Sequence, residues 1–187
     1  MKGNTKLKKR TYNNEVRLNQ TDKAILRALE AVVEGVAKIF GSNCEVILHS
    51  LEDLSHSVTK IANGYVTGRR VGSPLTDFGI EILKKADSLE DDVIGSYYSK
   101  LDDGRSLKSV TILIRNTQGK PIGFICINID LSVPLSDFLK GFLPMGDEPS
   151  PEAVIEHFPL SMQDLIFRSL QLVMTDVNNR RGLSPSE

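Results

Sequence analysis

SLKSVTILIRNTQGKPIGFICINID, residues 106–130, is the stretch that decides the fold of this chain. Two apolar runs flank the short segment NTQG (residues 116–119), whose length and glycine are typical of a tight connection between antiparallel strands. The second run, GFICINI, is continuously apolar, which indicates a central strand that is buried on both faces. The sequence therefore predicts a β-hairpin at the centre of a sheet.

Three further strand candidates lie upstream of this hairpin. They are CEVILHSL (residues 44–51), SVTKIAN (57–63) and GSYYSKLD (95–102). A helical segment, PLTDFGIEILKKA (74–86), separates the second from the third, with Ser73 predicted as its N-cap and Pro74 as its first helical residue. The predicted order is two strands, a helical crossing and three strands.

Two longer segments carry apolar residues at helical spacing. TDKAILRALEAVVEGVAKIF (residues 21–40) predicts an amphipathic helix that Thr21 or Asn19 caps and that Gly41 ends. SMQDLIFRSLQLVMTDVNNRR (residues 161–181) predicts a second amphipathic helix. The apolar stripes on both helices favour a homodimer, and the alternative is that they pack within one chain.

The composition is that of an ordinary soluble globular protein. Of 187 residues, 40% are hydrophobic and 25% are charged, and the formal net charge of -1 gives no global attraction to nucleic acid or anionic membranes. No apolar run approaches the roughly 20 residues that cross a bilayer, and no apolar block follows the basic N-terminus as in a secretory signal. The only two cysteines form no CxxC pair. We therefore expect a reduced, cytoplasmic protein with no membrane partner.

Three pieces of the sequence resemble one known family. EVILHSLEDL (residues 45–54), KIANGYVTGRRVGSPLTD (60–77) and LKSVTILIRNTQGKPIGFICINIDLSVPL (107–135) follow one another as in the bacterial YheO-like PAS domain, and residues 20–41 resemble its leading helix. The resemblance implies an α+β fold: a PAS-like five-stranded antiparallel sheet with helices on one face and flanking N- and C-terminal helices. It also implies a sensory domain followed by a C-terminal helix-turn-helix, which together make a transcriptional regulator.

The chain then divides into five segments. They are a flexible basic tail (residues 1–19), a PAS-like sensor domain (20–143), an acidic, proline-containing linker or loop (144–159), an amphipathic signalling or dimer helix (160–181) and a frayed end (182–187). For the basic tail, the alternative is an arm that touches nucleic acid. No second pair of helices follows residue 181, so we expect DNA contact only through a helix-turn-helix absent from this chain, which by itself should bind DNA poorly.

The segment NGYVTGRRVGSPLTD (residues 63–77) is the first place where a ligand is expected. Arg69 or Arg70, with the backbone N–H groups near the start of the following helix, would suit a small molecule that bears a carboxylate. The alternative is that both arginines are solvated and Ser73 only caps the helix. Lys108 and Asn128 lie among apolar strand neighbours, which predicts buried polar groups with an internal partner or one from a ligand. The candidate ligand-binding residues are His49, Ser50, Asn63, Arg69, Arg70, Ser73, Thr76, Asp77, Lys108, Cys126 and Asn128.

Nothing in the sequence indicates a metal site or a nucleophile. The three histidines, His49, His56 and His157, have no cysteine or carboxylate at the spacing of metal ligands. Cys44 and Cys126 lie in apolar strands, where a small buried thiol is the usual role. We therefore expect no metal, no cofactor and no catalytic residue.

Two other functions compete with that of a sensor. One is a structural dimerisation module without a ligand, whose interior would be filled by side chains. The other is a small enzyme, which would need Arg69, Asp77 and His49 to converge in one pocket.

Overall fold

The computed structural model describes residues 16–143 and 158–181, which belong to two separate units and are considered separately. The predicted frayed end and most of the predicted basic tail and linker lie outside the described residues. The first part contains, in chain order, α1 (Gln20–Phe40), β1 (Cys44–Ser50), the 3-10 helix η1 (Leu54–His56), β2 (Val58–Ala62), α2 (Asp77–Lys84), the 3-10 helix η2 (Ala86–Ser88), β3 (Val93–Lys100), β4 (Ser106–Arg115), β5 (Pro121–Asp130) and α3 (Leu135–Lys140).

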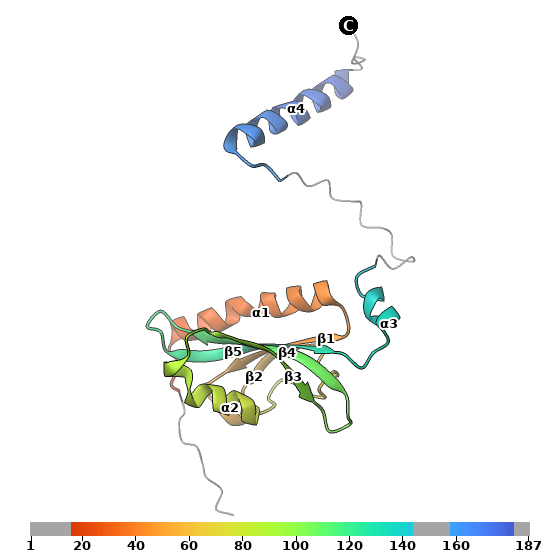
Figure 1. Cartoon of the computed structure of the whole chain (residues 1–187). Coiled ribbons are helices and arrows are strands. Elements are labelled where there is room, and N and C mark those ends of the chain that lie inside the picture. Colours follow the sequence, from red (N-terminus) through yellow and green to blue (C-terminus); the bar gives the residue numbers. More distant parts are fainter. Residues whose placement is uncertain (1–15, 144–157, 182–187) are drawn as a thin grey trace, which may run out of the picture. The chain divides into compact units, whose positions relative to one another are not determined.

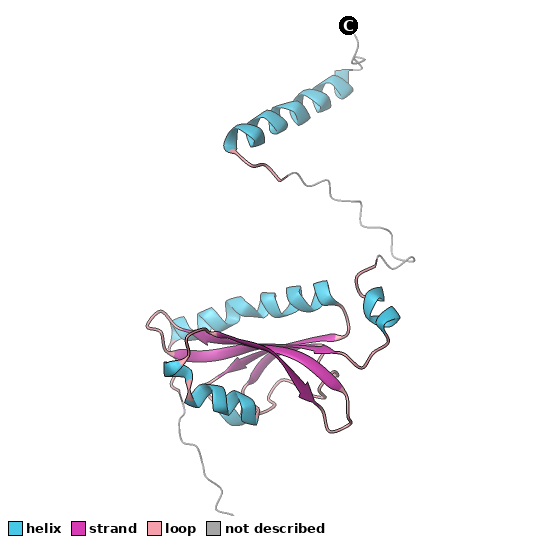
Figure 2. Cartoon of the chain, viewed as in Figure 1, coloured by secondary structure: helices cyan, strands magenta, loops and turns pink. Residues whose placement is uncertain are grey.

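The five strands form one antiparallel sheet in the order β2-β1-β5-β4-β3 (Figure 2). β4 and β5 pair as the predicted hairpin, and Gly119 in its turn has φ 76°, a conformation that glycine adopts without a Cβ clash. β5 lies between β1 and β4, so the apolar run GFICINI is central, as predicted. The predicted α+β fold with a five-stranded antiparallel sheet is confirmed.

The two faces of this sheet are covered by different helices (Figure 1). α1 lies on one face, where it packs against β1, β2 and β5. The cluster on this face contains Leu26, Val33, Ala37, Val46 and Leu48. α2 and η2 lie on the other face, and the cluster there contains Leu51, Leu75, Ile82, Leu113 and Phe124. Residues of one strand alternate between these two faces, as the pleat requires.

The start of α1 follows one of the two predicted caps. The side chain of Asn19 accepts a hydrogen bond from the N–H of Asp22 at 2.9 Å, and the Asp22 carboxylate accepts one from the N–H of Asn19 at 3.1 Å. This reciprocal capping box satisfies two backbone donors that the first turn leaves without a partner. At the other end, Gly41 follows the helix with φ 76°.

The predicted start of α2 is wrong. Thr76, and not Ser73, is the N-cap, since its Oγ1 accepts a hydrogen bond from the N–H of Gly79 at 3.1 Å. Ser73 instead closes a turn by accepting from the N–H of Arg70 at 3.0 Å. Leu75 donates its N–H to the carbonyl of Leu54 at 2.8 Å, which keeps the chain extended through Pro74. A tertiary hydrogen bond therefore delays the helix beyond the point where the local signal places it.

The second described part, residues 158–181, contains α4 (Met162–Arg181), so a helix is present where one was predicted. Ser161 Oγ accepts a hydrogen bond from the N–H of Asp164 at 3.1 Å and so caps its start. None of the helices in the described residues combines the length and the apolar character that crossing a membrane demands.

Gly123 tests the packing between α1 and the centre of the sheet. A Cβ at this position would lie 2.4 Å from the carbonyl oxygen of His49 and 2.7 Å from Cδ2 of Leu26. The Gly123→Ala substitution should therefore lower the free energy of unfolding by about 1–3 kcal/mol, as overpacking does. Urea denaturation followed by circular dichroism measures this change.

Gly35 in α1 provides the matched control. A Cβ there has no atom within 4 Å. Gly35→Ala should raise the free energy of unfolding by roughly 0.5–1 kcal/mol, because alanine loses less backbone entropy in a helix. Equal stability of the wild type and Gly123→Ala would contradict the tight contact.

Candidate functional site

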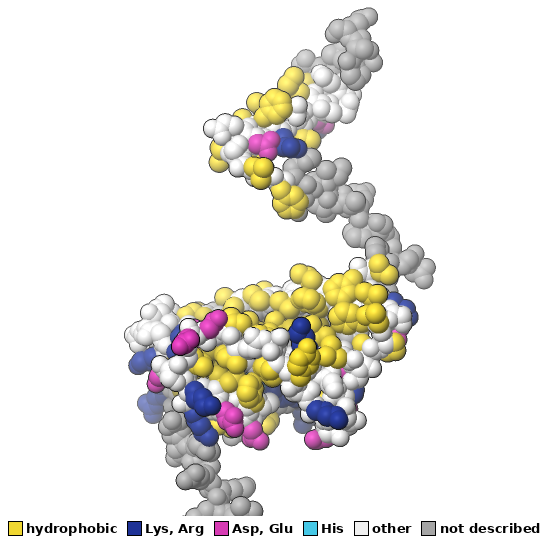
Figure 3. Space-filling model, viewed as in Figure 1, with side chains coloured by type: hydrophobic (Ala, Val, Ile, Leu, Met, Phe, Trp, Pro, Cys, Tyr) yellow, Lys and Arg dark blue, Asp and Glu magenta, His cyan; other side chains and the backbone are white. Residues whose placement is uncertain are grey.

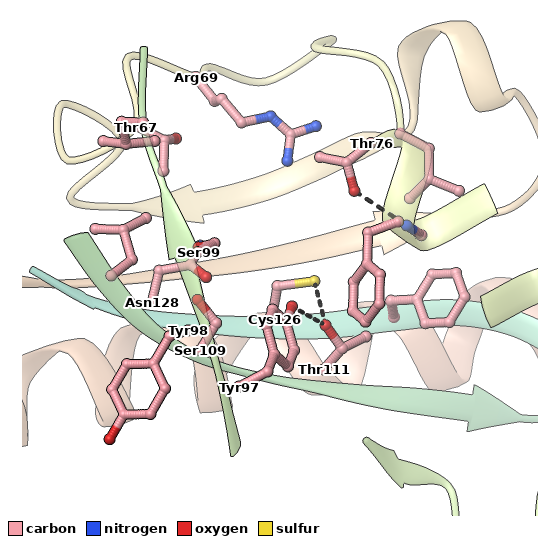
Figure 4. Close-up of a pocket in the computed structure, with 16 residues that line it drawn as sticks. Thr67, Arg69, Thr76, Tyr97, Tyr98, Ser99, Ser109, Thr111, Cys126 and Asn128 are labelled. Atoms are coloured by element: carbon pink, nitrogen blue, oxygen red, sulfur yellow. Dashed lines mark hydrogen bonds between the residues drawn. The ribbon is translucent and has the colours of Figure 1, made fainter. Parts of the chain in front are cut away.

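A cavity of about 600 Å³ lies between the sheet and the chain that leads into α2 (Figure 4). Its floor is formed by β3, β4 and β5 on the face opposite α1. Its roof is residues 63–76, called the roof segment below. Its apolar wall contains Leu75, Phe78, Leu101, Leu107 and Phe124. The cavity is therefore mostly apolar, and its polar groups are concentrated on the floor and in the roof segment.

The floor is built by alternate residues of neighbouring strands. Ser109 pairs with Asn128 and Thr111 pairs with Cys126, so these four side chains point to the same face of the sheet. Asn128 Nδ2 donates a hydrogen bond to Glu45 Oε1 at 2.9 Å, which is the internal partner favoured from the sequence. Thr111 Oγ1 lies 3.6 Å from Cys126 Sγ.

A β-bulge in β3 places Tyr97 in the cavity. The register with β4 shifts between Gly95 and Tyr97, so that Tyr97 pairs with Ser109 and shares its face. The Tyr97 hydroxyl lies 2.9 Å from Thr111 Oγ1, and its ring centroid is 4.7 Å from that of Phe78. Burial raises the pKa of Tyr97. Its hydroxyl therefore acts as a neutral hydrogen-bonding group.

Ser109 is the floor residue whose buried hydroxyl lacks a hydrogen-bond partner. It is only 3% exposed, and its Oγ has no hydrogen-bond partner among the described residues. An unpaired buried hydroxyl costs about 1–3 kcal/mol, so such groups are uncommon in folded proteins. A hydrogen bond to a molecule in the cavity would remove this cost.

The roof segment is held to the sheet by specific hydrogen bonds. At its start, Asn63 has φ 54° and its Nδ2 donates to the carbonyls of Gly41 at 3.0 Å and Cys44 at 2.7 Å. At its return, the N–H of Gly72 donates to the carbonyl of Val58 at 2.8 Å. Gly64 allows the segment to fold onto itself, because a Cβ there would lie 2.4 Å from the carbonyl oxygen of Arg69. The roof segment is thus a defined structure and more than a connector.

Glu45 provides a further anchor from below. It is fully buried in β1, and its Oε2 accepts hydrogen bonds from Thr67 Oγ1 at 2.7 Å and from the N–H of Thr67 at 3.2 Å. Burial raises the pKa of Glu45, and the hydrogen bonds from Thr67 and Asn128 oppose part of this effect. Glu45 was not predicted as a site residue, because a glutamate within an apolar run gives no sign of which segment will cover it.

Among the described residues that line the cavity, Arg69 alone carries a formal charge. Figure 4 shows its guanidinium above the floor residues Ser109 and Cys126. Nη2 donates a hydrogen bond to the carbonyl of Pro74, and no described carboxylate lies within 4.0 Å to form an ion pair with Arg69. Burial lowers the pKa of Arg69, so its charge is held at a cost in free energy.

Nucleophilic and metal chemistry have no support in the described residues. Burial raises the pKa of Cys126 and raises that of Cys44 to about 11, so both thiols stay protonated. The described residues contain no group of three or more His, Cys, Asp or Glu side chains suited to a metal ion. His157 lies outside the described residues.

Four of the eleven candidate residues line the cavity, namely Arg69, Thr76, Cys126 and Asn128. Asn63, Arg70 and Ser73 shape the roof segment instead. Asp77 is exposed in the first turn of α2, and Ser50 Oγ accepts from the N–H of Glu52 at 3.2 Å. The predicted burial of Lys108 is wrong, because its pairing with Ile129 turns it to the face of the sheet opposite the cavity, where it is exposed.

Several lining residues were not predicted from the sequence. They are Thr67, Tyr97, Tyr98, Ser99, Ser109 and Thr111. The alternation of polar and apolar residues in β4 was an available signal for Ser109 and Thr111, because it places both on the face of Leu107 and Leu113. Tyr97 had no comparable signal, since the bulge that turns it inward depends on pairing with β4.

His49 gives the folded protein a specific pH dependence. It is 1% exposed, and its Nδ1 lies 2.8 Å from Ser57 Oγ. Its pKa is lowered from 6.5 to about 3, mainly by burial and to a smaller extent by the charge of Arg69. As the pH falls below 6.5, His49 therefore takes up a proton in the unfolded chain before it does so in the folded protein. The free energy of unfolding should decrease over this window towards pH 3, by at most about 1.4 kcal/mol per pH unit.

Urea denaturation at several pH values checks this expectation. His49→Gln retains a polar partner for Ser57 and removes the titration, so its stability should fall less steeply over that window. Identical slopes in His49→Gln and wild type would show that His49 does not remain neutral.

Comparisons with known proteins agree with this architecture. The sequence profile of the YheO-like PAS domain matches residues 19–144. "Uncharacterized protein YheO" of Escherichia coli (strain K12) is 40% identical over 166 residues, which cover 89% of this chain and 68% of that protein. An "Uncharacterized protein" of Haemophilus influenzae is 38% identical over 174 residues, or 93% of this chain and 77% of that protein.

A third relative carries a functional name. "Transcriptional regulator DauR" of Pseudomonas aeruginosa is 34% identical over 125 residues, which cover 67% of this chain and 55% of that protein. The profile match spans the sheet, the cavity and the helices α1 to α3. The chain therefore belongs to the YheO-like PAS domain family.

Proposed function

We propose that this domain is the sensory part of a cytoplasmic transcriptional regulator and that a small molecule bound in the cavity changes the state of that regulator. The observation that carries the proposal is the unpaired Oγ of Ser109 on the floor of a cavity of about 600 Å³. The regulatory role is supported by the relative named transcriptional regulator DauR. DNA contact is assigned to a helix-turn-helix that the described residues do not include.

The cavity favours a ligand over a module whose interior is filled. Its volume of about 600 Å³ lies within the range of small-molecule sites, roughly 300–1,000 Å³, and its apolar wall with a few polar groups matches their usual chemistry. A side-chain-filled core would instead satisfy Ser109 internally. The open volume and the unpaired hydroxyl both support binding.

Binding without catalysis fits the polar groups better than an enzyme does. The enzyme alternative needs Arg69, Asp77 and His49 in one pocket, and only Arg69 lines the cavity. His49 is buried against Ser57, and Asp77 is exposed at the start of α2. No activated nucleophile or base reaches the cavity from these residues.

The contacts of the roof segment suggest how a bound ligand acts at a distance. Asn63 donates to the carbonyl of Gly41 at the end of α1. Gly41 packs on Gly141, where a Cβ on Gly41 would lie 3.1 Å from Cα of Gly141, and the rings of Phe40 and Phe142 meet at 6.2 Å. A shift of the roof segment would thus reach the residues that follow α3. This coupling requires different ligand affinities in the two arrangements.

A variant that fills the cavity tests the sensory proposal. Ser109→Leu places a larger apolar side chain on the floor, so it should abolish the rise in melting temperature, of about a few °C, that a small-molecule extract of the source cells produces in the wild type. Differential scanning fluorimetry measures the response, and mass spectrometry of the natively purified protein identifies a retained molecule.

Lys108→Leu is the matched control, because this neighbour is exposed on the opposite face of β4. It should respond to the extract as the wild type does. A folded Ser109→Leu variant that keeps the full response would refute the cavity as the sensory site, and so would a wild type that never responds.

We also propose that the domain forms a homodimer through the face of the sheet that α1 leaves open. α1 packs on β1, β2 and β5 and leaves β3 uncovered on the same face, where the pairing of Val93 with Ile112 and of Tyr98 with Lys108 directs both side chains. Val32 is 44% exposed on α1, and Val93 and Tyr98 are 49% and 73% exposed on β3. Figure 3 shows hydrophobic side chains gathered over α1, the adjoining sheet and α3. A second copy supplies the same apolar surface, which is self-complementary in a two-fold interface.

A charge placed in this surface should weaken the dimer. Val32→Glu buries an unpaired carboxylate in the proposed interface, so the dimer dissociation constant should rise at least about tenfold. Val71→Glu is the control, because Val71 is exposed in the roof segment on the other side of the sheet. Analytical ultracentrifugation measures both variants. An unchanged dimer in Val32→Glu, or a monomeric wild type, would exclude this interface.

A further inference from the structure

We propose that the ligand is a small organic monoanion, with a carboxylate bound by Arg69, an apolar body in the cavity and a second polar group that meets Ser109. This inference rests on the proposed sensory function and specifies the chemistry of the same site. Three independent features carry it: an arginine without a counter-ion, an apolar wall and one unpaired hydroxyl.

Arg69 needs an anion that the described protein does not supply. A guanidinium carries five N–H donors, and the one observed hydrogen bond, from Nη2 to the carbonyl of Pro74, uses a single donor. Glu45 is the carboxylate in electrostatic contact with Arg69, and its oxygens already accept hydrogen bonds from Thr67 and Asn128. A partly buried cation that is not paired is unfavourable, and a ligand carboxylate would form the two parallel hydrogen bonds that a guanidinium favours.

The remaining lining limits the ligand to one negative charge. Arg69 is the only charged side chain among the described lining residues, so a phosphate chain or a dicarboxylate would leave charge without a partner. Arg70, the adjacent cation, is exposed and does not line the cavity. Phe78, Phe124 and Leu107 present apolar surface to the rest of the space, which fits an aromatic or aliphatic body.

Ser109 marks the place where the second polar group of the ligand would bind. Figure 4 shows it on the floor, across the cavity from the guanidinium of Arg69. The neighbouring polar groups already have hydrogen-bond partners. The Tyr97 hydroxyl is bonded to Thr111 Oγ1, and Asn128 Nδ2 donates to Glu45. A hydroxyl or carbonyl at the far end of the ligand would therefore find Ser109 as its partner once a rotation about the Cα–Cβ bond turns Oγ, which exposes less than 1 Å² of its surface, towards the cavity.

Matched acids and amides test the charge requirement. The probes are phenylacetate, 3-phenylpropanoate, 4-phenylbutanoate, hexanoate and octanoate, each with its neutral primary amide, titrated into the whole chain by calorimetry or ligand-observed NMR. We expect at least one acid to bind about 10- to 100-fold more tightly than its amide, which is the range for losing a charge-assisted hydrogen bond. Arg69→Gln should remove this preference, while the control Arg70→Gln should retain it.

A hydroxylated probe tests the role of Ser109. 3-(4-Hydroxyphenyl)propanoate should bind the wild type more tightly than 3-phenylpropanoate, by about three- to tenfold for one neutral hydrogen bond. Ser109→Ala should abolish that difference and preserve the acid-over-amide preference. An unchanged advantage of the hydroxylated acid in Ser109→Ala would remove Ser109 from the inference.

The outcomes separate this inference from the function on which it rests. Amides that bind as tightly as acids would overturn the inference that the ligand is an anion, and so would an acid preference that survives Arg69→Gln. Binding of these probes would still support a sensory cavity. Failure of every acid to bind at millimolar concentration would also overturn it. In that case a thermal response of the wild type to the cell extract, lost in Ser109→Leu, would keep the sensory function intact.

Discussion

The buried carboxylate of Glu45 is the interaction on which the rest of the site depends. It has no exposed surface in β1, and it accepts hydrogen bonds from Asn128 in β5 and from both the N–H and Oγ1 of Thr67 in the roof segment. Burying a carboxylate costs several kcal/mol unless its oxygens are satisfied. A roof segment that moved away would leave that carboxylate without donors, so Glu45 fixes the height of the roof above the sheet.

That anchor accounts for the unusual position of Arg69. The roof segment turns tightly at Gly64 and is fastened at Asn63 and Thr67, so Arg69 is held over the floor and is partly shielded from bulk water. The site thus combines an immobilised cation with an apolar wall. Fixing such groups before a ligand arrives reduces the ordering cost of binding. It also means that a ligand able to move Arg69 must act on the same hydrogen bonds that tie the roof segment to Gly41 and Cys44.

Several particular elements could be predicted from the sequence, and others could not. The hairpin of β4 and β5 follows from two β-branched runs around NTQG, and α1 follows from helical spacing with a capping asparagine. The start of α2 was misplaced, because the hydrogen bond from Leu75 to Leu54 keeps the chain extended past a proline that locally favours a helix. In the site, Arg69, Thr76, Cys126 and Asn128 were predicted to bind a ligand and do line the cavity.

The sequence by itself determined the five strands and the helices α1 and α4 of this protein, because hydrophobic periodicity and capping act over a few neighbouring residues. It also determined which residues could share a face of each regular strand. Only the tertiary structure decided which of those faces enclose a cavity. The bulge that turns Tyr97 inward, the roof held by Glu45 and the unpaired Ser109 all depend on segments far apart in the chain. Their positions follow from strand pairing and packing, whose energies are set by the partners that meet in space.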